Sequence, residues 1–325
     1  QYFARVATPG VYAKAMADDL RLGRRLASLF GASTFLGQAV VQQPELGDLL
    51  LFGRVRPSEE SARKAVADEV ARAQRGDGEL DPDAFVGALR RAKNGVTMEV
   101  GLADLVGEVT TRDCTLVLSA LADAELDAAL RFALRERGAE EARGISIVAM
   151  GKLGGREVGY GSDLDIFFVY DDPSDEAAAY WTRIAARVLR LVSAPHGAGA
   201  GYELDTRLRP SGNHGLLVVS LEAFARYHRV PLGEASPDGV DPPSADWERQ
   251  ALVKARPCAG DAAVGQGVAE VALRAAYLRP APPPERVHHL RMRMEKELAG
   301  ERLGGGRRRY DLKLGRGGLA DVEFA

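Results

Sequence analysis

The sequence has few of the features that mark secreted, membrane-bound or nucleic-acid-binding proteins. It has two cysteines in 325 residues, Cys114 and Cys258, both in stretches with a helical pattern and without C-x-x-C spacing, which favours a reducing, cytoplasmic compartment. No apolar run approaches the length of a membrane span, and no charged start leads into a signal peptide. Because the formal net charge is only -3, we expect neither nucleic acid nor a membrane as a partner.

Familiar cofactor and metal motifs are missing as well. The glycines around Lys152 form neither G-x-x-x-x-G-K-[ST] nor G-x-G-x-x-G, which disfavours a P-loop and a dinucleotide-binding Rossmann unit. The five histidines fall in no spacing that suits a zinc site. The run 307–309 consists of three arginines beside glycines, a pattern that is more often a solvated surface than a nucleic-acid patch.

The composition is that of a globular protein with more than one packed unit. Hydrophobic residues make up 46% and charged residues 27% of the chain, which is enough to bury a core. At 325 residues the chain exceeds the size at which one core keeps growing. We predict an α+β protein with a helical domain over 1–143, a unit of strands and helices over 144–260, and the start of a helical C-terminal domain over 261–325. The sequence ends with GGLADVEFA, which is expected to be the start of a helix, so we expect the chain to be a fragment of a longer polypeptide.

Local signals support this division. Before residue 143, apolar side chains recur at helical spacing, and Asp81 with Pro82 and Thr110 with Asp113 are typical helix N-terminal caps. Four short runs in the second unit are predicted strands. They cover 145–150, 163–170, 202–209 and 215–220.

The rest of the chain is predicted to be a loop followed by helices. Residues 230–244 are dense in Pro, Gly and Asp and are expected to form a loop. Residues 245–256 are expected to form one helix that ends at Pro257, with further helices over 262–278 and 285–300.

Asp163 and Asp165 are the first candidate site residues. They lie two apart at the head of an apolar strand, so the period of the strand sends both carboxylates to one face. Two close carboxylates suit Mg²⁺, with substrate phosphate oxygens completing its shell. In a chain with 46 acidic residues, such a pair is often only a solvated surface feature. However, Gly161 and Ser162 come just before it and could form a tight turn whose backbone N–H groups and Ser162 hydroxyl face a phosphate.

Asp205 is the third candidate. On a strand, Asp205, Arg207 and Arg209 would share one face, and a third carboxylate would supply enough ligands for a site with two metal ions. The arginines could neutralise charge on a triphosphate or on departing pyrophosphate. The alternative is that they only pair with Asp205 or with surface carboxylates. Lys152 could contact phosphate, or its glycines could serve only close packing.

Four motifs, in order, resemble the glutamine synthetase adenylyltransferase/adenylyl-removing enzyme family. They are VAMGKLGGREVGYGSDLDIFFVYDD, YELDTRLRPSGNHGLLVVSLEAFARYH, DWERQALVKAR and RYDLKLGRGGLADVEF, and the helical stretches before them extend the resemblance over nearly the whole chain. The wording GYGSDLD, RLRPSG and RYDLKLGRGG is more similar to the adenylylating half of that family. The loop 230–244 is longer and richer in proline than the family pattern, and Asp246 also departs from it.

The resemblance implies a DNA polymerase β-like nucleotidyltransferase domain over 144–260, flanked by helical domains. This domain would transfer AMP from ATP to a tyrosine hydroxyl of glutamine synthetase and so regulate nitrogen assimilation. Asp163 and Asp165 would bind Mg²⁺, with two ions expected and Mn²⁺ able to substitute, and Asp205 would be the third ligand and the proton acceptor. Gly161 and Ser162 would hold phosphate, together with Lys152 and the two arginines. The PII signalling protein and glutamine are the implied regulators.

Other functions remain open at this point. The same fold could catalyse the reverse reaction, which is phosphorolytic removal of AMP from the modified synthetase with release of ADP. A non-catalytic module that binds nucleotide or the PII protein is a second alternative. Lys313, Asp321 and Glu323 frame a GRGG sequence near the end of the chain, but glycines there can serve only a turn before a helix, so these residues are left out of the predicted site.

Overall fold

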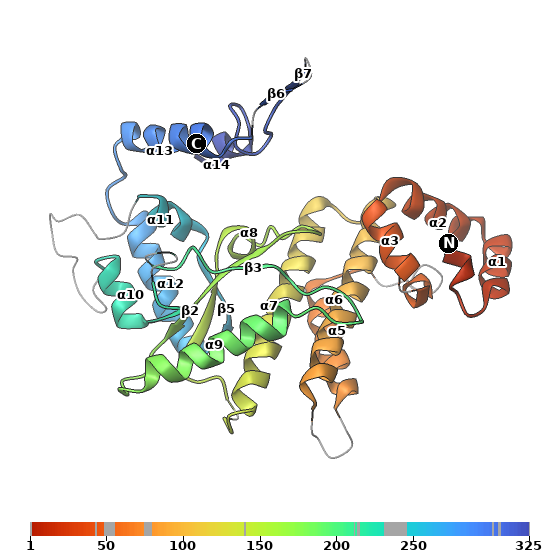
Figure 1. Cartoon of the computed structure of the whole chain (residues 1–325), viewed down its shortest axis with the longest axis horizontal. Coiled ribbons are helices and arrows are strands. Elements are labelled where there is room, and N and C mark those ends of the chain that lie inside the picture. The colour runs from red at the N-terminus through yellow and green to blue at the C-terminus, as the bar shows by residue number, and fades with distance from the viewer. Residues whose placement is uncertain are drawn as a thin grey trace.

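Helices make up most of the chain, and a small mixed sheet lies in its middle (Figure 1). This computed structural model describes residues 2–42, 44–48, 56–74, 80–139, 141–210, 212, 215–230, 246–300, 302–304 and 307–324. The α+β class predicted from the sequence is confirmed. Within those ranges, no helix has both the length and the apolarity needed to cross a membrane.

Three short helices begin the chain and lie at the end of the molecule farthest from the sheet (Figure 1). They are α1 (Pro9–Asp18), α2 (Leu20–Ala32) and α3 (Thr34–Gln42), with single 3-10 turns at Tyr2–Ala4 and Pro44–Leu46. Their small core includes Leu29, Leu36 and Val40 and is closed by Met98 from the next helical layer.

That next layer consists of α5 (Glu59–Ala73), α6 (Pro82–Leu105) and α7 (Thr111–Arg135). The predicted caps are confirmed, because the Asp81 carboxylate accepts from the N–H groups of residues 83 and 84, and Thr110 and Asp113 form a reciprocal capping box. These caps supply partners for N–H groups that a helix start leaves unpaired, which is why the helices begin where the sequence signals lie.

The sheet has five short strands. They are β1 (Ile145–Ala149), β2 (Leu164–Tyr170), β3 (Leu204–Asp205), β4 (Val218–Ser220) and β5 (Arg256–Gly260). The order is β3-β2-β1-β5, with β4 also paired to β2. β1 runs antiparallel to β2 and β5, whereas β3 and β4 run parallel to β2.

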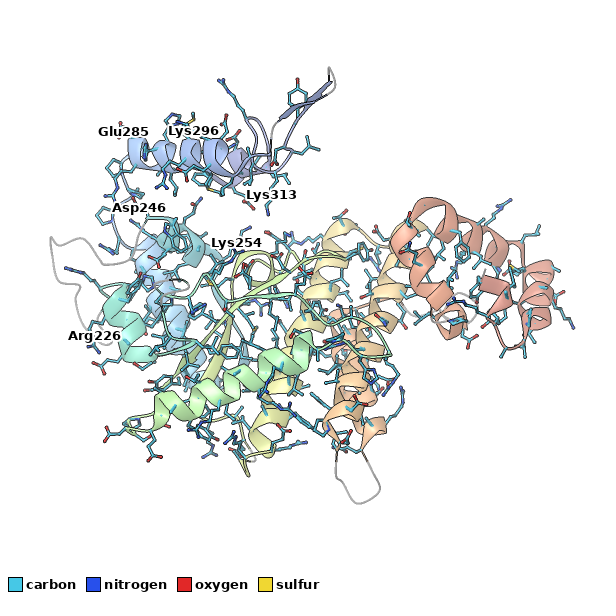
Figure 2. The ribbon with its side chains drawn as sticks, in the orientation of Figure 1. Arg226, Asp246, Lys254, Glu285, Lys296 and Lys313 are labelled. Atoms are coloured by element: carbon cyan, nitrogen blue, oxygen red, sulfur yellow. The ribbon has the colours of Figure 1, made fainter. Side chains whose placement is uncertain are left out.

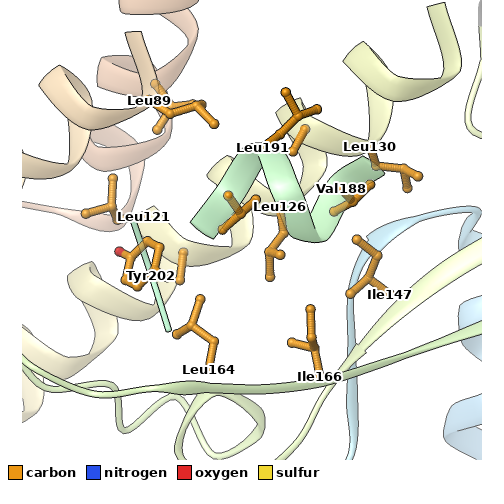
Figure 3. Close-up of a cluster of buried hydrophobic side chains, with 14 of the residues drawn as sticks. Leu89, Leu121, Leu126, Leu130, Ile147, Leu164, Ile166, Val188, Leu191 and Tyr202 are labelled. Atoms are coloured by element: carbon orange, nitrogen blue, oxygen red, sulfur yellow. The ribbon is translucent and has the colours of Figure 1, made fainter. Parts of the chain in front are cut away.

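Both faces of the sheet are covered by helices. Ile145, Ile147 and Ala149 belong to one core with α5, α6, α7 and α9 (Ala177–Ser193), part of which is drawn in Figure 3. On the other face, Val148 and Met150 pack with α10 (Leu221–Tyr227) and α12 (Ala262–Tyr277). This alternation explains why every residue of β1 is buried. It also means that one core crosses the predicted boundary at residue 143, and that α12 packs with the sheet although it follows the predicted boundary at residue 260.

Two local predictions are wrong. The expected helix 245–256 is a short helix α11 (Asp246–Ala251) and a 3-10 turn (Leu252–Lys254), and its last residue, Arg256, already lies in strand β5 with Pro257 and Cys258. A proline without an N–H group is tolerated there because β5 is an edge strand and its pairing with β1 shifts register next to Val148, the partner of Pro257. The predicted strand 202–209 is reduced to Leu204–Asp205. Most of the predicted loop 230–244 lies outside the described residues.

The end of the chain forms a unit that lies above α11 in the view of Figure 1. It contains α13 (Pro284–Leu298), a hairpin of β6 (Arg302–Gly304) and β7 (Arg307–Arg309), a loop over 310–318 and α14 (Leu319–Phe324). The predicted helix over 285–300 and the helical pattern at the very end are both confirmed. We call this part, residues 284–324, the C-terminal unit.

Candidate functional site

The three predicted carboxylates meet at one edge of the sheet. β2 and β3 pair in parallel with Asp165 opposite Asp205, and Leu164 N–H donates to the carbonyl of Glu203 at 2.9 Å. Carboxylate oxygens of Asp163, Asp165 and Asp205 lie within 4.8 Å of one another. Because 40 residues separate the last two, only the strand pairing brings them together. Three hard oxygen donors at this spacing fit a divalent cation such as Mg²⁺.

A tight turn at α8 (Gly151–Gly154) lies directly against this cluster. The N–H of Met150 donates to the backbone carbonyl of Asp165 at 2.8 Å, which fixes the start of the turn on β2. Gly151 has a φ of 50°, and a Cβ atom placed there would be 2.3 Å from Asp165 Oδ2. At Gly154 a Cβ would be 2.0 Å from the carbonyl oxygen of Lys254. Only glycine fits at these two positions, because a side chain would collide with the neighbouring oxygen atoms. Gly151 in particular leaves room for the Asp165 carboxylate.

The cluster is short of positive charge. The pKa of the Asp165 carboxyl is raised to about 6, first by burial and then by the charges of Asp163 and Asp205, while Lys152 and Lys313 act in the opposite direction. Nζ of Lys152 is 3.8 Å from Asp163 Oδ1. The carboxylates repel one another at this spacing, and one of them is partly buried. A bound cation would offset that repulsion.

Arg207 pairs with the third carboxylate. Its Nε donates to both oxygens of Asp205, at 3.0 and 2.8 Å, and its backbone N–H also donates to Asp205 Oδ1 at 2.8 Å. These hydrogen bonds hold the pKa of Asp205 below its usual value. They also form a turn on the Asp205 side chain, which ends the strand there and explains why the predicted strand is so short.

The other predicted site residues lie in different surroundings. Arg209 does not share the face of Asp205, because its guanidinium donates to the carbonyl oxygens of Thr206 and Gly215 and holds the turn after β3. Ser162 accepts from the N–H of Gly159 at 3.0 Å, so its hydroxyl stabilises the turn before Asp163. Gly161 is exposed, with open space where a Cβ would stand.

Two contributors were not included in the sequence prediction. Gly151 was considered only as part of a glycine-rich stretch, and its role depends on a contact with a residue 14 positions later. Lys313 was considered and left out, because the glycines beside it could serve only a turn, whereas in the structure its charge acts on Asp165. The GRGG sequence beside Lys313 was the available signal, but it did not indicate which group the lysine would face.

The small mixed sheet and the three convergent carboxylates define an α+β protein with a candidate site for a divalent cation. Residues 23–271 match the model of the family described as glutamate-ammonia ligase adenylyltransferase. The chain belongs to this family, which implies a nucleotidyltransferase fold.

Curated relatives give the same result. The chain is 34% identical over 98% of its length to a protein of Burkholderia pseudomallei named bifunctional glutamine synthetase adenylyltransferase/adenylyl-removing enzyme, and covers 33% of that protein. Proteins of the same name from Aromatoleum aromaticum and Chromobacterium violaceum are 33% and 35% identical over 98% and 93% of this chain, which covers 32% of each of them. The chain spans about a third of the length of the curated relatives it matches.

Proposed function

We propose that this chain is a Mg²⁺-dependent nucleotidyltransferase that moves AMP from ATP to a tyrosine hydroxyl of glutamine synthetase. The observation that carries the proposal is the pairing of Asp165 with Asp205, which completes a carboxylate cluster in a member of this family. We further propose that the strands over 144–260 form a DNA polymerase β-like domain between helical domains, and that the protein acts in the cytoplasm.

Each side chain has a role in this proposal. Asp163, Asp165 and Asp205 would hold two Mg²⁺ ions, or Mn²⁺ in their place, and these ions would neutralise phosphate charge and ease loss of the proton from the attacking hydroxyl. Lys152 would contact phosphate, because its ammonium already faces Asp163 across 3.8 Å. Gly161 and Ser162 would shape the adjoining phosphate turn.

Asp205 is the proposed proton acceptor for the tyrosine hydroxyl. A tyrosine has an unperturbed pKa of about 10, so transfer at neutral pH needs an acceptor nearby. Both oxygens of Asp205 accept from Arg207, whose side chain is 70% exposed. A phosphate at the site would draw Arg207 from Asp205, which supplies charge to the substrate and releases the carboxylate. Arg209 would act indirectly, by holding the turn that carries Arg207.

The reverse reaction is the second candidate. The relatives are named for both adenylyl transfer and adenylyl removal, and this chain spans about a third of them. A chain that carries the removing activity would act on modified glutamine synthetase and phosphate and would release ADP. The PII signalling protein and glutamine are proposed as regulators of the full-length protein.

The test combines the purified chain with unmodified glutamine synthetase, Mg²⁺ and ATP labelled on the α-phosphate. We expect stable label on the synthetase, no label with Asp163→Ala, and normal labelling with Asp175→Ala, which removes an exposed carboxylate outside the cluster. Release of ADP from modified synthetase and phosphate, without forward labelling, would assign the removing activity. No reaction in either direction would contradict an enzymatic function and favour a binding module.

A further inference from the structure

Strand β3 is too short to fix the position of Asp205 by itself. It contains two residues, and a pairing of that length with β2 supplies few hydrogen bonds, among them the one from Leu164 N–H to the carbonyl of Glu203 at 2.9 Å. The position of Asp205 therefore depends on the chain that precedes it. We call residues 194–203 the α9–β3 segment, and Figure 1 shows it passing from the end of α9 to the side of α6 and back to β3.

Two side chains of α6 hold the first part of this segment. Arg90 is fully buried, and its Nη2 donates to the carbonyl oxygens of Leu191 and Ala194 at 2.9 and 2.7 Å, which fixes the end of α9. Nδ2 of Asn94 donates to the carbonyl of Ala198 at 2.7 Å. Both side chains project from one face of α6, because they are four residues apart on the helix.

Lys93 holds the last part of the segment. Its Nζ donates to the carbonyl oxygens of Gly201 at 2.8 Å and Ala200 at 3.3 Å, and it lies 4.1 Å from the centroid of the Tyr202 ring. Two charge-assisted hydrogen bonds and a cation–π contact therefore come from one ammonium group. Tyr202 is only 7% exposed, so the ring that Lys93 contacts is itself fixed in the core.

The segment is packed closely between this contact and β3. The N–H of Tyr202 donates to the carbonyl of Val192 at 3.1 Å, and a Cβ atom at Gly201 would lie 2.4 Å from the same oxygen. Two residues separate Gly201 from the start of β3. A displacement of the backbone at Gly201 would therefore be passed on to Asp205 and would change its distance from the other two carboxylates.

We propose that Lys93 is a positioning residue for the metal site, because its hydrogen bonds to the α9–β3 segment hold Asp205 opposite Asp165. This inference rests on the proposed function and deepens it, since a side chain of the helical layer then takes part in forming the metal site. Lys93 acts through Asp205, which remains the ligand. A ligand that is held in place before the cation arrives loses little freedom on binding, which strengthens the binding.

The experiment measures the dissociation constant of Mn²⁺ by calorimetry on the full chain. Lys93→Met keeps the unbranched apolar stem and removes the donors, and it should weaken Mn²⁺ binding about tenfold, the lower end of the effect of groups that orient metal ligands. Lys93→Arg keeps the charge and the donors and should recover most of the affinity. If Lys93→Met does not fold, Lys93→Gln takes its place, because its shorter, neutral side chain also loses these hydrogen bonds.

Two control variants separate positioning from general effects. Val66→Ala shortens a side chain on α5 that is buried in the same core, so it should lower the urea midpoint and leave the Mn²⁺ dissociation constant unchanged. Lys296→Met removes an exposed lysine from α13, in a different part of the molecule from α6 (Figure 2), and should bind Mn²⁺ as the wild type does.

A double variant tests whether Lys93 acts through Asp205. In a chain that already carries Asp205→Ala the positioned ligand is gone, so adding Lys93→Met should weaken the remaining Mn²⁺ binding by less than about twofold. An equal loss of affinity in both backgrounds would overturn the inference, because the effect would not pass through Asp205.

The other outcomes separate this inference from the proposed function. A wild-type dissociation constant in Lys93→Met, in a chain that transfers AMP, would overturn the role of Lys93 and leave the function standing. Absence of Mn²⁺ binding in the wild type would contradict the proposed function and this inference together. A loss of affinity in either control equal to that of Lys93→Met would also overturn the inference, because it would indicate a general effect of stability or charge.

Discussion

Replacing Gly151 by alanine is the most informative perturbation of the site. The added Cβ would lie 2.3 Å from Asp165 Oδ2, whereas ordinary contacts begin at 3.4 Å, so the carboxylate has to move by about 1 Å. A misplacement of about 1 Å in a reacting group can cost about 100-fold in rate. The φ of 50° adds a backbone cost of about 1 to 2 kcal/mol for alanine in the left-handed region.

The Gly151→Ala variant should therefore stay folded with a moderate loss of stability, while AMP transfer and Mn²⁺ affinity fall sharply. Transfer is measured with ATP labelled on the α-phosphate, Mn²⁺ binding by calorimetry, and stability by urea denaturation. Gly95→Ala is the matched control, because Gly95 lies in α6 with open space around its Cβ position, and helix propensity favours alanine by about 1 kcal/mol. Transfer by Gly151→Ala within threefold of the wild type would refute the reasoning.

Three further predictions concern the carboxylates and the segment that holds them. Asp205→Asn should abolish AMP transfer and change the free energy of unfolding by less than about 1 kcal/mol, because its ion-pair partner Arg207 has a side chain that is 70% exposed; near-normal turnover would exclude Asp205 as ligand and proton acceptor. The pKa of Asp165 is raised to about 6, so the folded chain holds this proton more tightly than the unfolded chain, and without metal the group lowers stability as the pH rises from about 4 through 6. Mg²⁺ competes with that proton, so the rise in melting temperature caused by Mg²⁺ should be larger at pH 7.5 than at pH 5, and equal rises would contradict the assignment. Asn94→Ala removes a 2.7 Å hydrogen bond from Nδ2 to the carbonyl of Ala198, in the segment that leads to β3, and should cost about 1 kcal/mol of stability and weaken Mn²⁺ binding; an unchanged Mn²⁺ affinity would show that this segment does not position Asp205.

The sequence predicted the fold best where the local signal was strong. The capping box of Thr110 and Asp113 and the β-branched run at Ile145 each have a local physical cause, and both elements form where they were predicted. The end of the segment 245–256 was predicted wrongly because edge pairing with β1, which no local pattern shows, draws Arg256 and the residues after it into a strand.

The site was predicted unevenly for the same reason. Asp163 and Asp165 are neighbours on one element, so their convergence follows from strand geometry. The meeting with Asp205 depends on the parallel pairing of β2 and β3, and the family resemblance supplied that residue more securely than periodicity did. Arg209 could not be separated from Arg207 in advance, because the turn formed on the Asp205 side chain ends the strand between them.

The predicted division at residue 143 follows a change of periodicity and not the extent of a core. Leu121 and Leu126 of α7 pack in one core with Ile147 of β1 and Ile166 of β2, so the helical layer and the sheet are continuous (Figure 3). A change from helical to strand periodicity at residue 144 marks a change of element type, and periodicity alone does not show which elements share a core.

The most direct test of the central claim is to locate the metal. Crystals of the chain grown with Mn²⁺ and a non-hydrolysable ATP analogue should show anomalous scattering from Mn²⁺ between Asp163, Asp165 and Asp205, with the phosphates of the analogue beside it. The same experiment with Asp163→Ala should lose or weaken that signal. Mn²⁺ bound elsewhere, or an analogue bound without Mn²⁺ at these three carboxylates, would contradict the account.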